Sequence, residues 1–275
     1  MTQPIAGEPA PDKPPVLMIH GLTGTPAELL SVTRALRIAG HPVEAPMMAG
    51  HGVDEATLSR TGWRDWLGGM QDELIRLSAD GPVFVGGLSM GAVLAMALAQ
   101  GFPERVRGLA LYAPTLRYDG FACPWFTPLL PALASTGLMR AYRFAERPPY
   151  GLKDERLRAV VSEMMLTRSS PDAGLAGTPG KSLADSIHLN RRVERRLEAV
   201  TAPALLVHPV EDDMTDIANS RRLAGRLGGP VRTLWLEDSY HLVTVDRQRN
   251  EVARATVGFF DDVLAGTPVT ARALT

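Results

Sequence analysis

The stretch PVFVGGLSMGAVLAMALA, residues 82–99, decides the fold. It opens with a compact apolar run that predicts a buried strand, and residues 90–99 are rich in Ala, Leu and Met, as expected of a buried helix. Between the two, GLSMG (87–91) places Ser89 in the turn from strand to helix, in the pattern Gly-x-Ser-x-Gly. Glycines suit this turn because Cβ atoms there would collide with the adjoining strand and helix. The segment therefore predicts a nucleophilic serine at the end of a buried strand.

Apolar runs alternate with helical segments on both sides of this stretch. Further strands are predicted at 16–20, 42–46, 108–113, 202–208 and 231–237. Helices are predicted at 27–39, 63–78 and 247–264. Asp246 is the expected N-cap of the last helix. Such an alternation indicates an α/β fold with a mostly parallel central sheet flanked by helices.

Residues 115–200 break this rhythm, with prolines at 124, 128 and 131 and several large apolar side chains. We expect this segment to be a helical cap inserted between two strands of the core. The core then consists of residues 16–114 and 201–264. A flexible N-terminal tail (1–15) and a C-terminal tail (265–275) complete the predicted organisation.

Composition excludes several classes of protein. The chain has 275 residues, is 45% hydrophobic and carries a net charge of −1, so it can bury a sizeable core, and its overall charge does not favour binding to nucleic acid. Its one cysteine, Cys123, cannot form an intramolecular disulfide. No cofactor motif or metal-ligand spacing is present, so neither a cofactor nor a metal is expected. Without a secretory signal or a long apolar segment, we expect a cytoplasmic protein with no stable membrane insertion, of undetermined oligomeric state.

A serine hydroxyl needs a base, and the base needs an orienting acid. His241 follows the last predicted strand, in EDSYHLVTVD (237–246), at the sheet edge where Ser89 also emerges. His208, at the end of a strand, is better interpreted as a core histidine. The acid is expected in the loop after 202–208, which offers four carboxylates: Glu211, Asp212, Asp213 and Asp216. The residue types alone do not choose among them.

Negative charge on a tetrahedral intermediate is best stabilised by backbone N–H donors. The N–H of Met90, directly after Ser89, is one candidate donor. The other lies in HGLTG (20–24), after the first strand, and Leu22 is the best candidate there. His20 is expected to hold this loop by hydrogen bonding rather than to transfer protons.

Together, six segments resemble the α/β-hydrolase superfamily, and within it the bacterial carboxylesterase and monoacylglycerol lipase group. They are HGLTGTP (20–26), GHG (50–52), TGWRDW (61–66), GLSMGA (87–92), DDM (212–214) and DSYHLVTVD (238–246). The resemblance implies Ser89 as nucleophile, His241 as base and Asp212 as acid, with the oxyanion at the N–H groups of Leu22 and Met90. Asp213 stays possible as the acid, because Thr215 is polar where the family has an apolar residue.

The expected activity is hydrolysis of a carboxylic ester through an acyl-enzyme, with a small-molecule acyl ester as the partner. Apolar side chains of the cap could line an acyl pocket for a medium-chain ester or a monoacylglycerol, or could simply be the core of the cap. They are Phe121, Trp125, Phe126, Leu129, Leu130, Leu133, Leu138 and Met139. A thioesterase or acyltransferase, or a C–C bond hydrolase, would use the same three residues. A non-catalytic receptor on the same scaffold is a further alternative.

Overall fold

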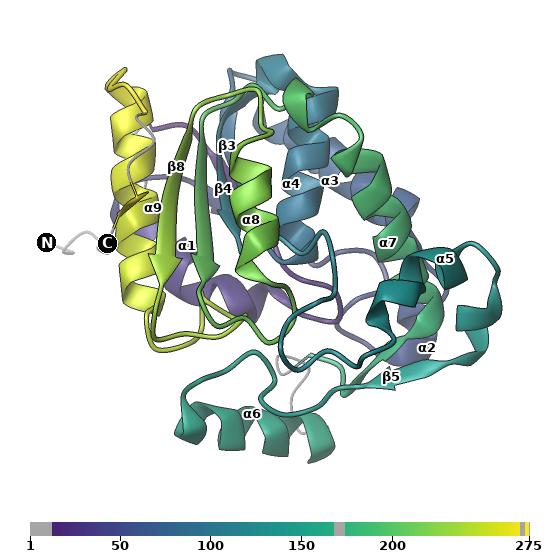
Figure 1. Cartoon of the computed structure of the whole chain (residues 1–275). Helices are drawn as coiled ribbons and strands as arrows, with labels where there is room; N and C mark the ends of the chain where they lie inside the picture. The colour runs from purple at the N-terminus through teal and green to yellow at the C-terminus, as the bar shows by residue number, and fades with distance from the viewer. Residues whose placement is uncertain (1–12, 168–173, 270–272, 275) are drawn as a thin grey trace, which may run out of the picture.

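A seven-stranded sheet forms the centre of the computed structural model, which describes residues 13–167, 174–269 and 273–274 (Figure 1). Every neighbouring pair of strands in this sheet is parallel. In spatial order the strands are β2 (Val43–Glu44), β1 (Val16–Ile19), β3 (Val83–Leu88), β4 (Val106–Tyr112), β7 (Ala204–Pro209), β8 (Val231–Leu236) and β9 (Ala273–Leu274). The predicted parallel α/β architecture is confirmed.

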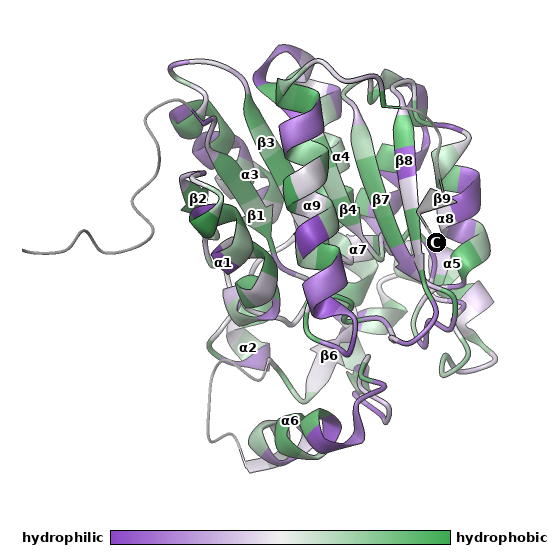
Figure 2. Cartoon of the chain, turned by 90° about the vertical axis from the view of Figure 1, so that its left-hand side faces the viewer, coloured by the Kyte–Doolittle hydropathy of each residue, from purple (hydrophilic) through white to green (hydrophobic). Residues whose placement is uncertain are grey.

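Helices cover both faces of the sheet. One face carries α1 (Leu30–Ile38) and α9 (Arg249–Leu264). The other carries α3 (Trp63–Leu77), α4 (Met90–Gly101), α7 (Gly180–Glu194) and α8 (Ile217–Ala224). Alternate residues of β1, β3, β4 and β7 enter the two cores, so these strands consist mostly of apolar residues. Figure 2 shows this: β1, β3 and β7 have hydrophobic colours, whereas α9 carries polar stretches.

Shorter elements complete the layers. They are α2 (Glu55–Leu58) and the 3-10 turns Pro26–Leu29, Pro103–Arg105, Thr127–Leu129, Leu138–Ala141 and Leu197–Ala199. The predicted helix 27–39 therefore begins as a 3-10 turn, with Thr25 as its N-cap. In the part of the chain that the structure describes, no helix combines the length and the apolar character needed to cross a bilayer.

The segment between β4 and β7 lies partly beyond the carboxyl ends of the strands (Figure 1). It contains α5 (Leu130–Ala134), β5 (Arg143–Ala145), α6 (Glu155–Thr167), β6 (Gly177–Pro179) and α7. Strands β5 and β6 form a small antiparallel pair. Leu189 and Val193 of α7, however, belong to the same core cluster as α4. The predicted insertion at 115–200 thus differs from the structure at its end, where α7 is a layer of the core.

Both ends of the core differ from the sequence prediction. Most of the predicted N-terminal tail, residues 1–12, lies outside the described residues, but the carbonyl of Pro15 accepts a hydrogen bond from the Phe84 N–H (3.0 Å) and so extends the pairing of β1 with β3. Within the predicted C-terminal tail, Ala273–Leu274 pairs with β8. These two segments are bound by backbone hydrogen bonds, which apolar patterning does not reveal.

The predicted role of Asp246 is wrong. Helix α9 begins after Gln248, and the buried carboxylate of Asp246 instead accepts three backbone N–H groups. These belong to Lys153 (2.7 Å), Asp154 (2.9 Å) and Tyr240 (2.7 Å). Asp246 therefore ties the inserted segment to the loop that carries His241, a contact between distant parts of the chain.

Candidate active site

Ser89 stands at the junction of β3 and α4 in a strained backbone conformation, with φ 57° and ψ −116°. Its own N–H donates to the Tyr112 carbonyl in the neighbouring strand (2.8 Å). A Cβ at position 87 would overlap the backbone of Gly91, and one at Gly91 would overlap the carbonyl of Ile19. Both glycines are therefore required for the turn, because any side chain would push α4 away from the sheet.

An imidazole and a carboxylate meet beside this serine. His241 Nδ1 lies 2.9 Å and 3.0 Å from the two carboxylate oxygens of Asp212, and both residues are buried. Oδ1 of Asp212 also accepts the N–H groups of Met214 (2.7 Å) and Thr215 (3.0 Å). Because a carboxylate only accepts, Nδ1 carries the ring proton, and Nε2 is left with a lone pair on its other side.

Asp213, the alternative acid, contacts the same histidine differently. Its Oδ1 accepts the backbone N–H of His241 (3.2 Å) and its Oδ2 accepts the N–H of Gly151 (2.9 Å). Both oxygens thus bind backbone amides, whereas the imidazole is bound by Asp212. The structure brings Asp212, not Asp213, to the ring. The residue types alone do not reveal this division, because it depends on which way each side chain leaves the loop; only the family resemblance implied Asp212.

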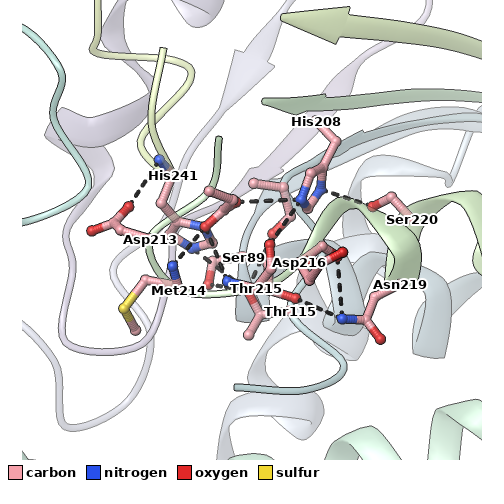
Figure 3. A network of polar contacts seen from close by, with 12 residues as sticks. Ser89, Thr115, His208, Asp213, Met214, Thr215, Asp216, Asn219, Ser220 and His241 are labelled. Atoms are coloured by element: carbon pink, nitrogen blue, oxygen red, sulfur yellow. Dashed lines mark hydrogen bonds and ion pairs between the residues drawn. The ribbon is translucent and has the colours of Figure 1, made fainter. Parts of the chain in front are cut away.

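Ser89 Oγ is in contact with a second hydroxyl, that of Thr115 (3.0 Å). Thr115 Oγ1 lies 3.5 Å from His241 Nε2, and among the described residues no direct hydrogen bond joins Ser89 to His241. Figure 3 shows Thr115 grouped with Ser89 and His241. Sequence reasoning missed Thr115, although its place just after β4, at the same sheet edge as Ser89, could have suggested it.

His208 is a buried core histidine, as predicted, and it also contacts the acid. Its Nε2 is 3.1 Å from the Thr215 carbonyl and 3.4 Å from Asp212 Oδ2, and its Nδ1 is 2.8 Å from the Ser220 hydroxyl. Figure 3 shows this arrangement around His208. Burial lowers the pKa of His208, so the ring is neutral and hydrogen-bonded rather than a proton carrier. Asp216, another of the four candidate acids, is the N-cap of α8 and accepts the Ala218 N–H (2.7 Å).

The carboxylates around His241 favour an ion pair between a protonated His241 and Asp212. Burial lowers the pKa of His241, but the carboxyls of Asp212, Asp213 and Glu28 outweigh it, so this pKa is raised above 6.5. Burial raises the pKa of Asp212, and the adjacent His241 outweighs that effect and lowers it. The geometry therefore stabilises an imidazolium next to a carboxylate, which is the state that a general base reaches after taking a proton.

The loop after β1 faces Ser89. His20 accepts the Met48 N–H at Nε2 (3.1 Å) and contacts the Gly21 carbonyl with Nδ1 (2.9 Å), and burial lowers its pKa to about 3. It is thus a neutral residue that holds the loop, as predicted. Within the described residues neither the Leu22 N–H nor the Met90 N–H donates a hydrogen bond. Both predicted oxyanion donors are consequently free to bind a ligand.

Glu28 stabilises the same loop by a hydrogen bond. Its Oε2 accepts the Gly21 N–H (3.2 Å), and burial raises the pKa of its carboxyl to about 7. A second carboxyl on the cavity wall, Glu146, accepts the Thr178 hydroxyl (3.2 Å), and burial raises its pKa as well. Sequence reasoning missed both residues, because neither belongs to a motif that by itself indicates chemistry.

A cavity of about 530 Å³ opens above Ser89 and His241. Apolar side chains from the insertion form much of its wall: Trp125, Phe126, Leu130, Phe144, Val161, Leu175 and Leu183. Of the cap residues named from the sequence, Phe126 and Leu130 line this cavity, and Trp125 does so at its mouth with 87% of its surface exposed.

Three of the predicted substrate-binding residues need correction. Phe121, Leu129 and Leu138 are 60%, 55% and 70% exposed and are not among the lining residues. Phe121 packs against the ring of Tyr240 instead. Leu133 and Met139 pack in the core of the insertion, the alternative that the sequence left open. Apolar character alone does not tell which face of a short helix points inward.

A family model described as "Serine aminopeptidase, S33" matches residues 10–248. The chain belongs to this family. A thermostable monoacylglycerol lipase of Bacillus sp. (strain H-257) is 25% identical over 249 residues, 89% of either chain. A carboxylesterase of Bacillus subtilis (strain 168) is 24% identical over 249 residues, which cover 90% of this chain and 92% of that protein.

Several solved structures have the same fold as this chain. One, from work on the metagenome-derived lipolytic enzymes LipS and LipT, matches with a TM-score of 0.76 at 24% identity, over 94% of this chain and 98% of that one. The monoacylglycerol lipase of Paleococcus ferrophilus matches with a TM-score of 0.74 at 20% identity, over 91% and 96%. The predicted α/β-hydrolase fold and the resemblance to the carboxylesterase and monoacylglycerol lipase group are confirmed.

Proposed function

We propose that this α/β-hydrolase cleaves carboxylic esters through an acyl-enzyme on Ser89. The observation that carries the proposal is that Ser89 and His241 line one cavity, and that the buried Asp212 carboxylate binds Nδ1 of the His241 imidazole (2.9 Å). Such a sequence of groups activates a hydroxyl that is otherwise a poor nucleophile. The names of the two Bacillus relatives support the ester as the bond that is cleaved.

Each group has a role in the proposed reaction. His241 accepts the proton of Ser89 as its oxygen attacks the ester carbonyl, and Asp212 stabilises the resulting imidazolium. The N–H groups of Leu22 and Met90 receive the developing oxyanion. His241 then protonates the departing alcohol, and water repeats the sequence to release the acid. Asp213 positions His241 through its backbone.

We further propose a medium-chain acyl ester or a monoacylglycerol as the substrate. The apolar wall of the cavity suits an alkyl chain, and polar groups such as Glu28 and Glu146 can hydrogen-bond the hydroxyls of an alcohol. One of the relatives is named a monoacylglycerol lipase. A cytoplasmic location remains a prediction from the sequence.

The test is a rate profile on p-nitrophenyl esters from acetate to palmitate, with a monoacylglycerol alongside. We expect a maximum at medium chain length that Ser89→Ala abolishes. Ser59→Ala is the matched control, because Ser59 caps α2 away from the cavity and its hydroxyl donates to the Glu55 carbonyl (2.8 Å). Turnover confined to acetate would contradict the substrate proposal, and undiminished turnover by Ser89→Ala would contradict the mechanism.

A further inference from the structure

Two glutamates on the cavity wall lie near the proposed catalytic centre. Glu28 lies in the 3-10 turn before α1, and Glu146 follows directly after β5. A Cβ built at Gly21 would lie 3.5 Å from Glu28 Oε2 and 3.5 Å from Ser89 Cβ, so this carboxyl and the nucleophile flank Gly21. Both glutamates are close enough to His241 to interact with its charge. The two carboxyls are therefore near the base that protonates the departing alcohol in the proposed reaction.

Each glutamate is held in place and has a carboxylate oxygen available. The carbonyl of Glu28 accepts the Thr244 hydroxyl (2.6 Å), and its Oε2 accepts the Gly21 N–H (3.2 Å). Oε1 of Glu146 accepts the hydroxyl of Thr178 in β6 (3.2 Å). Among the described residues, nothing donates to Glu28 Oε1 or to Glu146 Oε2. Each carboxyl therefore has one oxygen that a ligand can bind without breaking an existing hydrogen bond.

No basic side chain of the described ranges forms an ion pair with either carboxyl. Two arginines line the same cavity, but Arg143 donates twice to Glu55 (2.6 Å each), which is not a lining residue, and Arg147 pairs with neither glutamate there. Burial, together with the negative charge of Glu146, raises the pKa of Glu28 to about 7. Two carboxylates that share a cavity without a counter-ion are unfavourable to ionise.

Of the other described groups that face the glutamates, none supplies a standing positive charge. Burial raises the pKa of Glu146, and the negative charge of Asp213 raises it further. Tyr118 is neutral, because burial raises its pKa to about 12. His241 is neutral when it awaits the Ser89 proton. A hydroxyl of a ligand can donate to one carboxylate but leaves the charges of both uncompensated, whereas a protonated amine compensates them.

We propose that Glu28 and Glu146 form a binding site for a protonated amine on the alcohol side of the ester. This rests on the proposed ester hydrolysis, and among medium-chain esters it places those of amino alcohols first. The amine donates to the two free carboxylate oxygens, and the acyl chain lies along the apolar wall. The amino alcohol leaves with the proton that His241 returns to its oxygen. A monoacylglycerol binds at the same place through its hydroxyls, but more weakly.

The test compares two hexanoate esters of nearly equal shape. The 2-(dimethylamino)ethyl ester carries a protonated amine near neutral pH, and the 3-methylbutyl ester is its uncharged counterpart. We would measure kcat/KM for both with the full-length wild type, Glu28→Gln, Glu146→Gln and the double variant. The preference is the ratio of the two values. Comparing this ratio between proteins cancels the intrinsic difference in reactivity of the esters.

The matched control is Glu73→Gln, because Glu73 lies on α3 and forms a surface ion pair with Arg76 (2.7 Å) away from the cavity. Ligand-observed NMR with 2-(dimethylamino)ethanol and 3-methylbutan-1-ol gives a second readout, since it measures binding of the alcohol part without turnover. The same proteins are used in both measurements.

The preference for the amino ester should be roughly 10- to 100-fold greater in the wild type than in the double variant, the range for a hydrogen bond to a charged group. Each single variant should lose part of it, and Glu73→Gln should keep it. A carboxyl is charged above its pKa, so the wild-type preference should be present above about pH 7 and decline below it. The wild type should bind the amino alcohol more tightly than its neutral counterpart.

An equal preference in the wild type and the double variant would overturn the proposal. Loss of kcat/KM by the same factor for both esters would assign the glutamates a structural role and also overturn it. If Glu28→Gln does not fold, a wild-type preference that persists unchanged below pH 7 decides against the proposal. Failure of the proposed function is distinct, because the wild type would then hydrolyse neither ester, while NMR would still show whether the amino alcohol is preferred.

Discussion

Two adjacent carboxylates, Asp212 and Asp213, hold the same histidine through different atoms. Asp212 binds the imidazole and Asp213 binds the backbone N–H. The first contact changes in strength when the ring gains a proton, whereas the second fixes only where the ring stands. Their replacements should therefore affect catalysis in different ways.

Asp212→Asn should lower kcat by about 10³- to 10⁴-fold, because an amide neither stabilises the imidazolium nor fixes the ring tautomer. Asp213→Asn should cost far less, since the amide oxygen can still accept one of the two backbone N–H groups. Steady-state kinetics of the two variants on one ester checks this. A greater loss in Asp213→Asn than in Asp212→Asn would reverse the assignment of the acid.

The pH dependence follows from the raised pKa of His241. Only the neutral imidazole can take a proton, so kcat/KM should rise with pH as His241 deprotonates. Burial lowers this pKa, but the carboxyls of Asp212 and its neighbours raise it more, so the midpoint of the rise should lie above pH 6.5. Glu28→Gln, which removes a carboxyl of pKa about 7, is the control for a second group titrating in this range. A midpoint below 6.5 would contradict the electrostatic account.

Position along the chain was enough to place Ser89 and His241 near one another, because each follows a strand at the same sheet edge. It could not separate Asp212 from Asp213, since neighbouring residues differ only in side-chain direction. Thr115 escaped prediction because its significance comes from atoms more than 25 residues away along the chain.

The strand–turn–helix element that carries Ser89 depends on close packing of backbones. Gly91, in the first turn of α4, lies against the carbonyl of Ile19 in β1. This approach sets the distance between α4 and the sheet, and with it the height of Ser89 above the sheet edge. A methyl group at position 91 has no space unless the helix moves.

Gly91→Ala should therefore destabilise the fold by about 1–3 kcal/mol, the usual cost of overpacking, and lower activity as Ser89 shifts. Gly69→Ala is the matched control, because a Cβ at Gly69 in α3 meets nothing within 4 Å. That variant should gain about 0.5–1 kcal/mol, as alanine favours helix interiors. Urea unfolding measures both. Equal stability of the two variants would refute the packing argument.

Periodicity predicted the strands and major helices of the core, because strands buried on both faces consist of continuous apolar runs. It failed for contacts between distant segments. Asp246 looked like a helix cap from its neighbours, yet the N–H groups of Lys153 and Asp154 occupy its carboxylate. Helix α7 was predicted to be part of the cap. Its sequence alone does not show that it packs against α4.

On the scale of the whole molecule, the insertion forms one wall of a cavity whose floor belongs to the core. Its apolar residues divide between the cavity, the core of the insertion and the surface. The sequence predicted their presence but not this division, because the inward face of such short helices is set by the core beneath them.

Phe126 and Phe121 allow a matched test of this division, since only Phe126 lines the cavity. Phe126→Ala should raise KM for a medium-chain p-nitrophenyl ester about fivefold, corresponding to about 1 kcal/mol of lost apolar contact, and change KM for the acetate little. Phe121→Ala should leave both values within about twofold. The reverse order would mean that the acyl chain binds on the outer surface of the insertion.

Covalent labelling tests whether Ser89 is the nucleophile. The wild-type protein would be treated with a fluorophosphonate, digested and mapped by mass spectrometry, with Ser89→Ala treated in parallel. We predict one adduct per chain, on the peptide that contains Ser89, and none in the variant. An adduct on another residue, or ester hydrolysis by the wild type that persists unchanged in Ser89→Ala, would contradict the account.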